Sequence, residues 1–138
     1  MRRARPAVGD VVQFSLPDGT YAYGRVLRDA SVAFYRVRTS EPGRPPIGSR
    51  DYQFVVGVYN NVLKSEKVPI VGHDPRKDAD DEWPPPFAVH HPLTDTTDLY
   101  EKGNMRRADE SEIRGLEPAA VWDLHHLVDR LTGVQRGN

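Results

Sequence analysis

Prolines and glycines divide this chain into short segments. Its 138 residues include 12 prolines and 11 glycines, several of them clustered at 42–48 and 84–86. Proline breaks the interior of a helix, and glycine adopts the positive φ angles of tight turns. We therefore predict strands joined by turns rather than long helices, in one domain spanning residues 1–138. Residues 1–8 are expected to form a flexible N-terminal arm, and residues 132–138 a frayed C-terminal end.

Charge and composition argue against several classes of protein. The chain has 19 Lys and Arg against 20 Asp and Glu, and its pI of about 6.5 is well below the values above about 9 that are typical of nucleic-acid-binding domains. Cysteine is absent, which excludes disulfides, thiol nucleophiles and cysteine-based metal sites. No apolar run approaches the ~18 residues of a membrane span, and the basic start leads into no hydrophobic segment. We expect a cytoplasmic protein with no membrane segment and no cofactor.

Alternating apolar and polar residues predict an N-terminal hairpin. In residues 11–16, apolar side chains recur at every second position, as in a half-buried strand. Pro17-Asp18-Gly19 supplies a turn, and residues 21–27 return as the second strand. The segment 54–59 is apolar throughout, which places it at the centre of the sheet, and Asn60-Asn61 forms a turn after it. Further strands are predicted at 32–38, at 68–72, at 87–89 rejoining the same sheet, and in a small hairpin at 98–107.

Helices are predicted only near the C terminus. Asp109 is followed three residues later by Glu112, the capping-box pattern of a helix start. Asp123 is a good N-cap for a second helix over residues 124–131, whose leucines and valine form one apolar face. Residues 119–122 fit either a strand or a helix. The predicted fold class is α+β, mostly β: a bent antiparallel sheet, partly barrel-like, with short C-terminal helices.

The sequence contains no catalytic constellation. His125 and Asp129 are four residues apart on the predicted helix and share a face, but no third metal ligand is fixed by local spacing. A solvent-exposed pair on a helix surface is the simpler interpretation. The serines show no nucleophile-elbow pattern, and no glycine-rich phosphate loop is present. We expect neither a metal site nor enzyme activity.

Two groups of residues are candidates for binding a partner. Residues 74–82 carry five acidic side chains and lead into Trp83, so they could offer an acidic patch with an aromatic anchor to a basic partner. Plain solubility, and packing of Trp83 against the prolines that follow it, are the alternatives. On the predicted second strand an aromatic–basic stripe could form a surface of the nucleic-acid-binding type or pack in the core. The candidate contact residues are Asp78, Asp80, Asp81, Glu82, Trp83, Tyr21, Tyr23 and Arg25.

Three segments carry a resemblance to a known family. They are residues 9–26 (GDVVQFSLPDGTYAYGRV), residues 54–72 and residues 113–131. Together they resemble the immunity protein 26 family of bacterial polymorphic-toxin systems, although Val68 stands where an aromatic residue is expected. The resemblance implies a cytoplasmic protein that binds a cognate toxin domain from a neighbouring gene and occludes it non-covalently, without catalysis. A basic nuclease would suit the acidic residues as the toxin, and no direct nucleic-acid contact is expected.

Two other functions stay open at this point. One is a small-barrel nucleic-acid- or peptide-binding module, which requires Tyr21, Tyr23 and Arg25 to form an exposed face. The other is a hydrolase or metal enzyme that uses the histidines. The sequence leaves the oligomeric state open.

Overall fold

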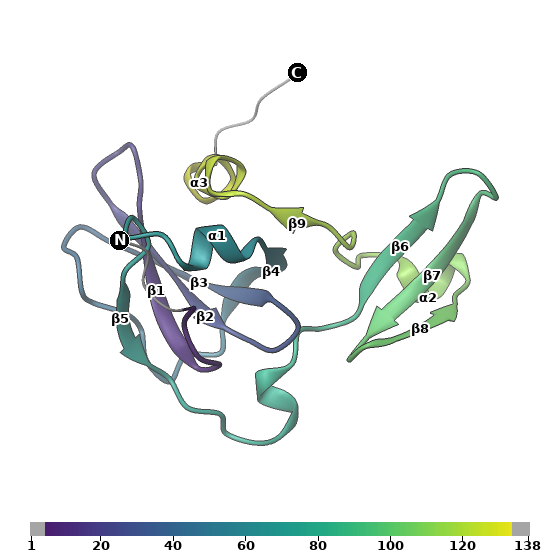
Figure 1. Ribbon diagram of the computed structural model, residues 1–138, viewed down its shortest axis with the longest axis horizontal. Coiled ribbons are helices and arrows are strands. Elements are labelled where there is room, and N and C mark those ends of the chain that lie inside the picture. Colours follow the sequence, from purple (N-terminus) through teal and green to yellow (C-terminus); the bar gives the residue numbers. More distant parts are fainter. Residues whose placement is uncertain (1–4, 134–138) are drawn as a thin grey trace.

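The computed structural model describes residues 5–133, which form two β-sheets and short helices (Figure 1). The strands are β1 (Asp10–Ser15), β2 (Tyr21–Val26), β3 (Ser31–Thr39), β4 (Tyr52–Val58), β5 (Ile70–His73), β6 (Phe87–His91), β7 (Thr96–Glu101), β8 (Asn104–Arg107) and β9 (Val121–Trp122). The helices are α1 (Asn60–Leu63), the 3-10 helix η1 (Asp80–Glu82), α2 (Glu110–Ile113) and α3 (Leu124–Thr132). The expectations for the two chain ends fall mainly on residues 1–4 and 134–138, outside the described residues.

The main sheet has six strands in the order β5-β1-β2-β3-β4-β9. The β1–β2 hairpin and the mostly β fold are confirmed. Two details differ from the prediction: the sheet is mixed, because β9 runs parallel to β4, and it is not closed into a barrel.

Strand β4 lies next to the edge strand β9 rather than at the centre of the sheet. Its apolar residues divide between a buried face and a partly exposed one. Phe54, Val56 and Val58 belong to the core on one face. On the other, Val55 borders a cleft beside Trp83, and Gly57 lets β9 approach so closely that an added Cβ would lie 3.0 Å from a carbonyl oxygen of Ala120.

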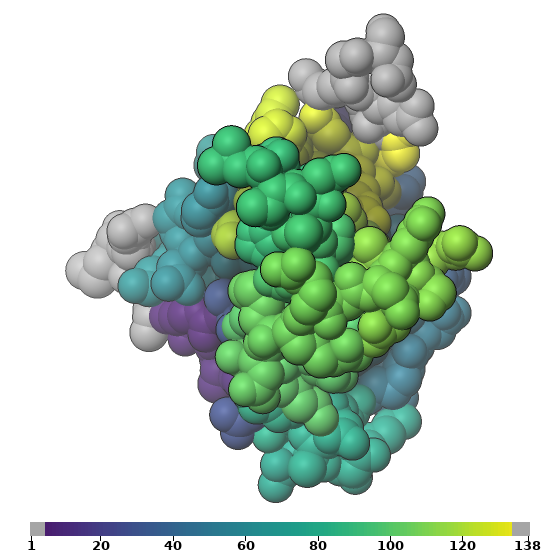
Figure 2. Space-filling view, turned by 90° about the vertical axis from the view of Figure 1, so that its right-hand side faces the viewer, coloured from purple at the N-terminus to yellow at the C-terminus, as the bar shows by residue number. Residues whose placement is uncertain are grey.

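The second sheet has three antiparallel strands in the order β6-β7-β8. The prediction that residues 87–89 rejoin the main sheet is therefore wrong, since β6 pairs with β7 instead. A two-residue turn, Lys102-Gly103, connects β7 to β8, and both residues have positive φ as in type I′ hairpins. Figure 1 shows this sheet to one side of the main sheet, and in Figure 2 it lies, in green, in front of the body of the molecule, with α3 in yellow above it.

Helices α1 and α3 cover one face of the main sheet (Figure 1). Val62 and Leu63 of α1 and Leu127 and Leu131 of α3 join the core cluster of the sheet. The predicted caps are confirmed: the side chain of Asp123 accepts a hydrogen bond from the N–H of His126, and Asp109 forms a capping box at α2. The expected turn at residues 60–61 is instead the start of α1, which the buried Val62 and Leu63 hold against the sheet.

An extended segment, residues 117–122, connects the two sheets. At its start, the N–H of Ala88 in β6 donates to Glu117 O (3.0 Å) and the N–H of Ala119 donates back to Ala88 O (2.7 Å). At its end, β9 pairs with β4, and the N–H of Tyr59 donates to Trp122 O (3.2 Å). Of the two structures predicted for residues 119–122, the strand is thus the one that forms, over residues 121–122.

Candidate partner-binding site

The second face of the main sheet buries polar side chains instead of exposing them. Tyr23 and Arg25 of β2 and Tyr35 of β3 have no exposed surface, and Tyr52 of β4 packs beside them. Of the two alternatives for the aromatic–basic stripe, packing in the core is thus the one that forms for Tyr23 and Arg25, and only Tyr21 keeps partial exposure. The aromatic–basic stripe of β2 belongs instead to a buried polar layer. The connection between β3 and β4 and the loop of residues 74–82 cover this layer.

Arg25 fixes the loop of residues 74–82 to the sheet. Its Nε donates to Asp74 O at 2.8 Å and its Nη1 donates to Asp81 O at 2.6 Å. Its Nη2 lies 3.5 Å from the Asp81 carboxylate. A buried guanidinium needs such acceptors, because leaving its donors unsatisfied in a dry interior is costly. One side chain of β2 therefore sets the positions of both ends of the loop.

Asp74 and Arg50 complete this buried network. The Oδ2 atom of Asp74 accepts hydrogen bonds from the Tyr35 hydroxyl (2.7 Å), the Gly48 N–H (3.0 Å) and Arg50 Nη1 (2.9 Å). Arg50 Nε lies 2.8 and 2.9 Å from the two carboxylate oxygens of Asp81. The network thus joins the proline-rich connection that contains Gly48 and Arg50 to the loop of residues 74–82.

Ionisation of the carboxylates in this network is coupled to folding. Burial opposes the charged form of Asp74, but the hydrogen bonds from Tyr35, Gly48 and Arg50 outweigh it and lower its pKa below the usual value. Burial likewise opposes the charge of Asp81, and the Arg50 guanidinium and the Lys77 N–H lower its pKa. Burial and the adjacent Asp74 carboxylate raise the pKa of the Tyr35 hydroxyl. The network is therefore stable with charged carboxylates and a neutral tyrosine.

We expect the protein to lose stability on acidification below about pH 4, the ordinary pKa of aspartate in an unfolded chain. Because the folded-state pKa values of Asp74 and Asp81 are lowered, their contribution is complete above that pH and is lost as the pH falls through the folded-state values. Urea denaturation between pH 2 and pH 7, followed by tryptophan fluorescence, measures this change. A free energy of unfolding that stayed constant down to pH 2 would contradict the coupling.

The loop of residues 74–82 is less acidic in the fold than in the sequence. Its five carboxylates are matched by Arg76 and Lys77 within the loop and by three arginines and Lys102 that bind it from elsewhere. Glu82 accepts from Arg28 Nε (2.9 Å) and from Arg76 Nη1 (3.0 Å). The broad acidic patch expected from the sequence is thus largely neutralised, and Asp78 and Asp80 are its most exposed carboxylates.

A cleft of about 450 Å³ lies between this loop, the main sheet and the β7–β8 turn. Trp83 is half-buried in its wall, with the Arg28 guanidinium carbon 5.7 Å from the ring centroid. Lys102 Nζ, from the β7–β8 turn, lies 2.7 Å from Asp80 Oδ1. The other lining residues are Leu27, Tyr52, Val55, Asp81, Pro84, Pro85 and Glu101. The structure therefore brings Asp80, Asp81 and Trp83 of the predicted contact residues to one concave site.

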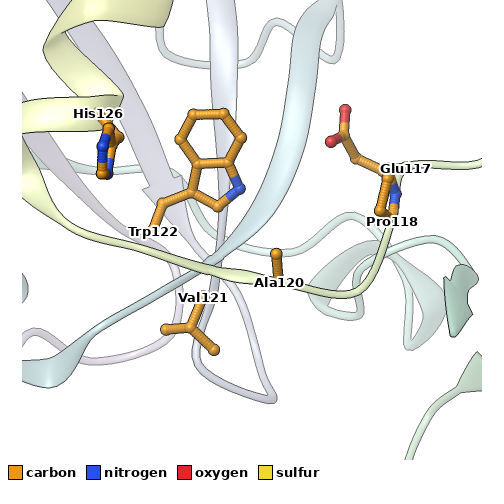
Figure 3. Close-up of a pocket in the computed structure, with 6 residues that line it drawn as sticks. All are labelled: Glu117, Pro118, Ala120, Val121, Trp122 and His126. Atoms are coloured by element: carbon orange, nitrogen blue, oxygen red, sulfur yellow. The ribbon is translucent and has the colours of Figure 1, made fainter. Parts of the chain in front are cut away.

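A second, smaller hollow of about 290 Å³ lies beside Trp122 (Figure 3). Trp122 and Val121 point in opposite directions from β9, and His126 of α3 lies beside the indole. The Arg130 guanidinium lies 5.1 Å from the Trp122 centroid and binds both carboxylate oxygens of Glu117 (3.0 and 2.6 Å). Val121 is 52% exposed, so the hollow presents an apolar rim at the edge of the main sheet.

Each of the five histidines lies beside an aspartate. His125 Nε2 lies 3.7 Å from Asp129 Oδ2 on the surface of α3. Among residues 5–133, no group of three or more His, Cys, Asp or Glu side chains is arranged to hold a metal ion. Within the same residues, no helix is long and apolar enough to cross a membrane.

Sequence reasoning missed the residues that organise this site. No sequence signal distinguishes Arg50 or Tyr35, Asp74 counts there only as one of five acidic residues, and the pattern around Arg25 fits either a surface or the core. One partial signal is present: Arg25 shares a side of its strand with Tyr23, so burial of that aromatic side would bury the arginine with it. A buried arginine requires carboxylate or carbonyl partners, and the aspartates of residues 74–82 were candidates for them.

A match to a protein-family model identifies the family of this chain. The model of the family described as Immunity protein 26 matches residues 7–98, about two-thirds of the sequence. The chain therefore belongs to the Immunity protein 26 family, which confirms the resemblance. The matched range contains β1 to β6 and the start of β7, whereas the resembling segment 113–131 lies beyond it. Comparisons with curated proteins and with solved structures give no match.

Proposed function

We propose that this protein is a bacterial, cytoplasmic immunity protein that binds a cognate toxin domain and neutralises it by non-covalent occlusion, without catalysis of its own. Membership of the Immunity protein 26 family is the observation that carries this proposal. The absence of a metal-ligand cluster among the described residues is compatible with a binding role. That the toxin is a nuclease stays a prediction.

We propose the Trp83 cleft and the exposed loop beside it as the toxin-binding surface. Partly buried tryptophans at the centre of a concave patch are typical anchors of protein interfaces. The buried network beneath the loop supports this choice, because it holds the loop in one conformation before binding and so reduces the entropy lost on association. Of the predicted contact residues, Asp78, Asp80, Asp81, Glu82 and Trp83 belong to this surface, and the buried Arg25 supports it from below. The buried Tyr23 instead binds the connection between β3 and β4 through its hydroxyl.

Co-expression with the product of the adjacent gene tests the proposed function. We expect the two proteins to copurify as a stable complex and expect this protein to restore growth of cells that express the neighbouring toxin. A catalytically inactivated toxin domain, used for purification, separates binding from toxicity. Absence of a complex together with absence of rescue would overturn the proposal.

A further inference from the structure

The carboxylates of the Trp83 cleft are not all neutralised in the same way. Asp81 is held by Arg50 and faces the buried Arg25, so its charge is used within the fold. Asp80 is 84% exposed and has Lys102 as its ion-pair partner. Glu101 also lines the cleft and is exposed. The hydrogen bond to Asp80 and the charge of Glu101 raise the pKa of Lys102, and Glu101 also contributes, after Glu112, to the raised pKa of Arg106. No ion pair of Glu101 occurs among the described residues, so Lys102 is the cation that Asp80 and Glu101 have in common at the mouth of the cleft.

The aromatic walls of the cleft suit a guanidinium group. Trp83 and Tyr52 both line it, and cations bind favourably over aromatic faces, arginine more often than lysine because its planar group also stacks. The molecule already places one arginine in this way, since Arg28 lies over the indole of Trp83. The hydroxyl oxygen of Tyr52 is buried close to Arg25 and forms no well-aligned hydrogen bond within the described part of the chain.

Lys102 spans the mouth of the cleft. It lies in the left-handed region, with φ of 50°, which lysine adopts rarely, and from there its Nζ reaches Asp80 across the mouth of the cleft. The pair is exposed, and such pairs contribute little to stability. Replacement of Lys102 by another cation at Asp80 should therefore change the stability of the fold only slightly.

We infer that the Trp83 cleft is a subsite for one arginine side chain of the toxin, with Asp80 and Glu101 as its carboxylate partners and Lys102 as the cation that it displaces. The inference rests on the proposed function and deepens it, since it replaces a broad acidic patch by a single recognition pocket. The volume of about 450 Å³ is within the range of roughly 300–1,000 Å³ that is typical of ligand-sized sites.

A titration with a small arginine probe tests the subsite without the toxin. We expect Nα-acetyl-arginine methylamide to shift the indole N–H resonance of Trp83 at millimolar concentrations, with Trp122, the other tryptophan of the chain, as an internal control. The citrulline analogue has the same shape without the charge and should bind at least about fivefold more weakly. Equal effects of the two probes, or an unchanged Trp83 resonance, would overturn the subsite.

Variants of the cleft residues provide the second part of the test. Lys102→Met removes the competing cation and should strengthen binding of the arginine probe roughly threefold, the range expected of an exposed ion pair. The double variant Asp80→Asn with Glu101→Gln should abolish it. The matched control is Asp95→Asn, because Asp95 is 93% exposed in the β6–β7 turn and should change nothing. Weaker binding, or no change, in Lys102→Met would contradict the role assigned to Lys102.

The same variants, measured against the inactivated toxin domain, separate this inference from the proposed function. Failure of the wild-type protein to bind the toxin would overturn the proposed function, and the arginine titration would still decide whether the cleft is a cation site. Binding of the toxin that is unchanged by Asp80→Asn with Glu101→Gln would retain the proposed function and overturn the subsite. Binding that is weakened at least tenfold by the double variant and strengthened by Lys102→Met would support both.

Discussion

Asp74→Ala is expected to lower the free energy of unfolding by about 3 kcal/mol, the lower end of the cost of removing one partner from a buried ion pair. The side chain of Asp74 is 3% exposed, and its Oδ2 atom accepts three hydrogen bonds. The substitution leaves the buried Tyr35 hydroxyl and the Gly48 N–H without their acceptor. It also leaves Arg25 and Arg50 with Asp81 as their shared carboxylate. Urea denaturation at pH 7 measures the loss.

Asp51→Ala is the matched control for this prediction. Asp51 forms an ion pair of similar length with Arg36, but the two side chains are 69% and 61% exposed. Its removal should therefore cost less than about 1 kcal/mol. The Asp74 variant should also show a weaker dependence of stability on pH below about pH 4, since one of the carboxylates with a lowered pKa is gone. Equal losses in the two variants would show that the buried network contributes no more than a surface pair.

Local features of this fold could be predicted from the sequence, because they depend on neighbouring residues. The β1–β2 hairpin follows from its alternating pattern and its turn residues. The N-caps Asp109 and Asp123 each bond to a backbone N–H three residues later. Both features involve short separations along the chain, where residue preferences and hydrogen-bonding geometry act directly.

The candidate site depends on long-range contacts, and these could not be predicted from local pattern. The acceptors of Arg25 are 49 and 56 residues away in the sequence. The burial of Tyr23 and Arg25 depends on loops that cover the sheet, and a period-2 pattern alone does not show which face such loops will cover. The hairpin predicted at 98–107 forms β7 and β8 of the second sheet, but the pairing of β6 with it could not be predicted, because residues 87–89 fit a strand whose sequence does not determine the partner strand.

Leu127→Ala is expected to destabilise the protein by about 3 kcal/mol, as is usual for large-to-small substitutions in a packed core. Leu127 is fully buried and belongs to the core cluster that contains Phe14, Phe34 and Phe54 of the main sheet. It lies in α3, beyond the residues matched by the family model. A large loss in one cooperative unfolding transition would support our expectation that the chain is a single domain whose C-terminal part completes the core.

Leu93→Ala is the control for the core substitution, because Leu93 is 100% exposed in the turn between β6 and β7. The same change of side chain at this position should alter the free energy of unfolding by less than about 0.5 kcal/mol. The difference between the two leucines therefore isolates the contribution of burial beneath α3 from that of side-chain size. If Leu127→Ala unfolded at the same urea concentration as the Leu93 variant, α3 would be an appendage and the single-domain interpretation would be wrong. A second, separate transition in the wild-type protein would lead to the same conclusion, since the main sheet would then keep its core without α3.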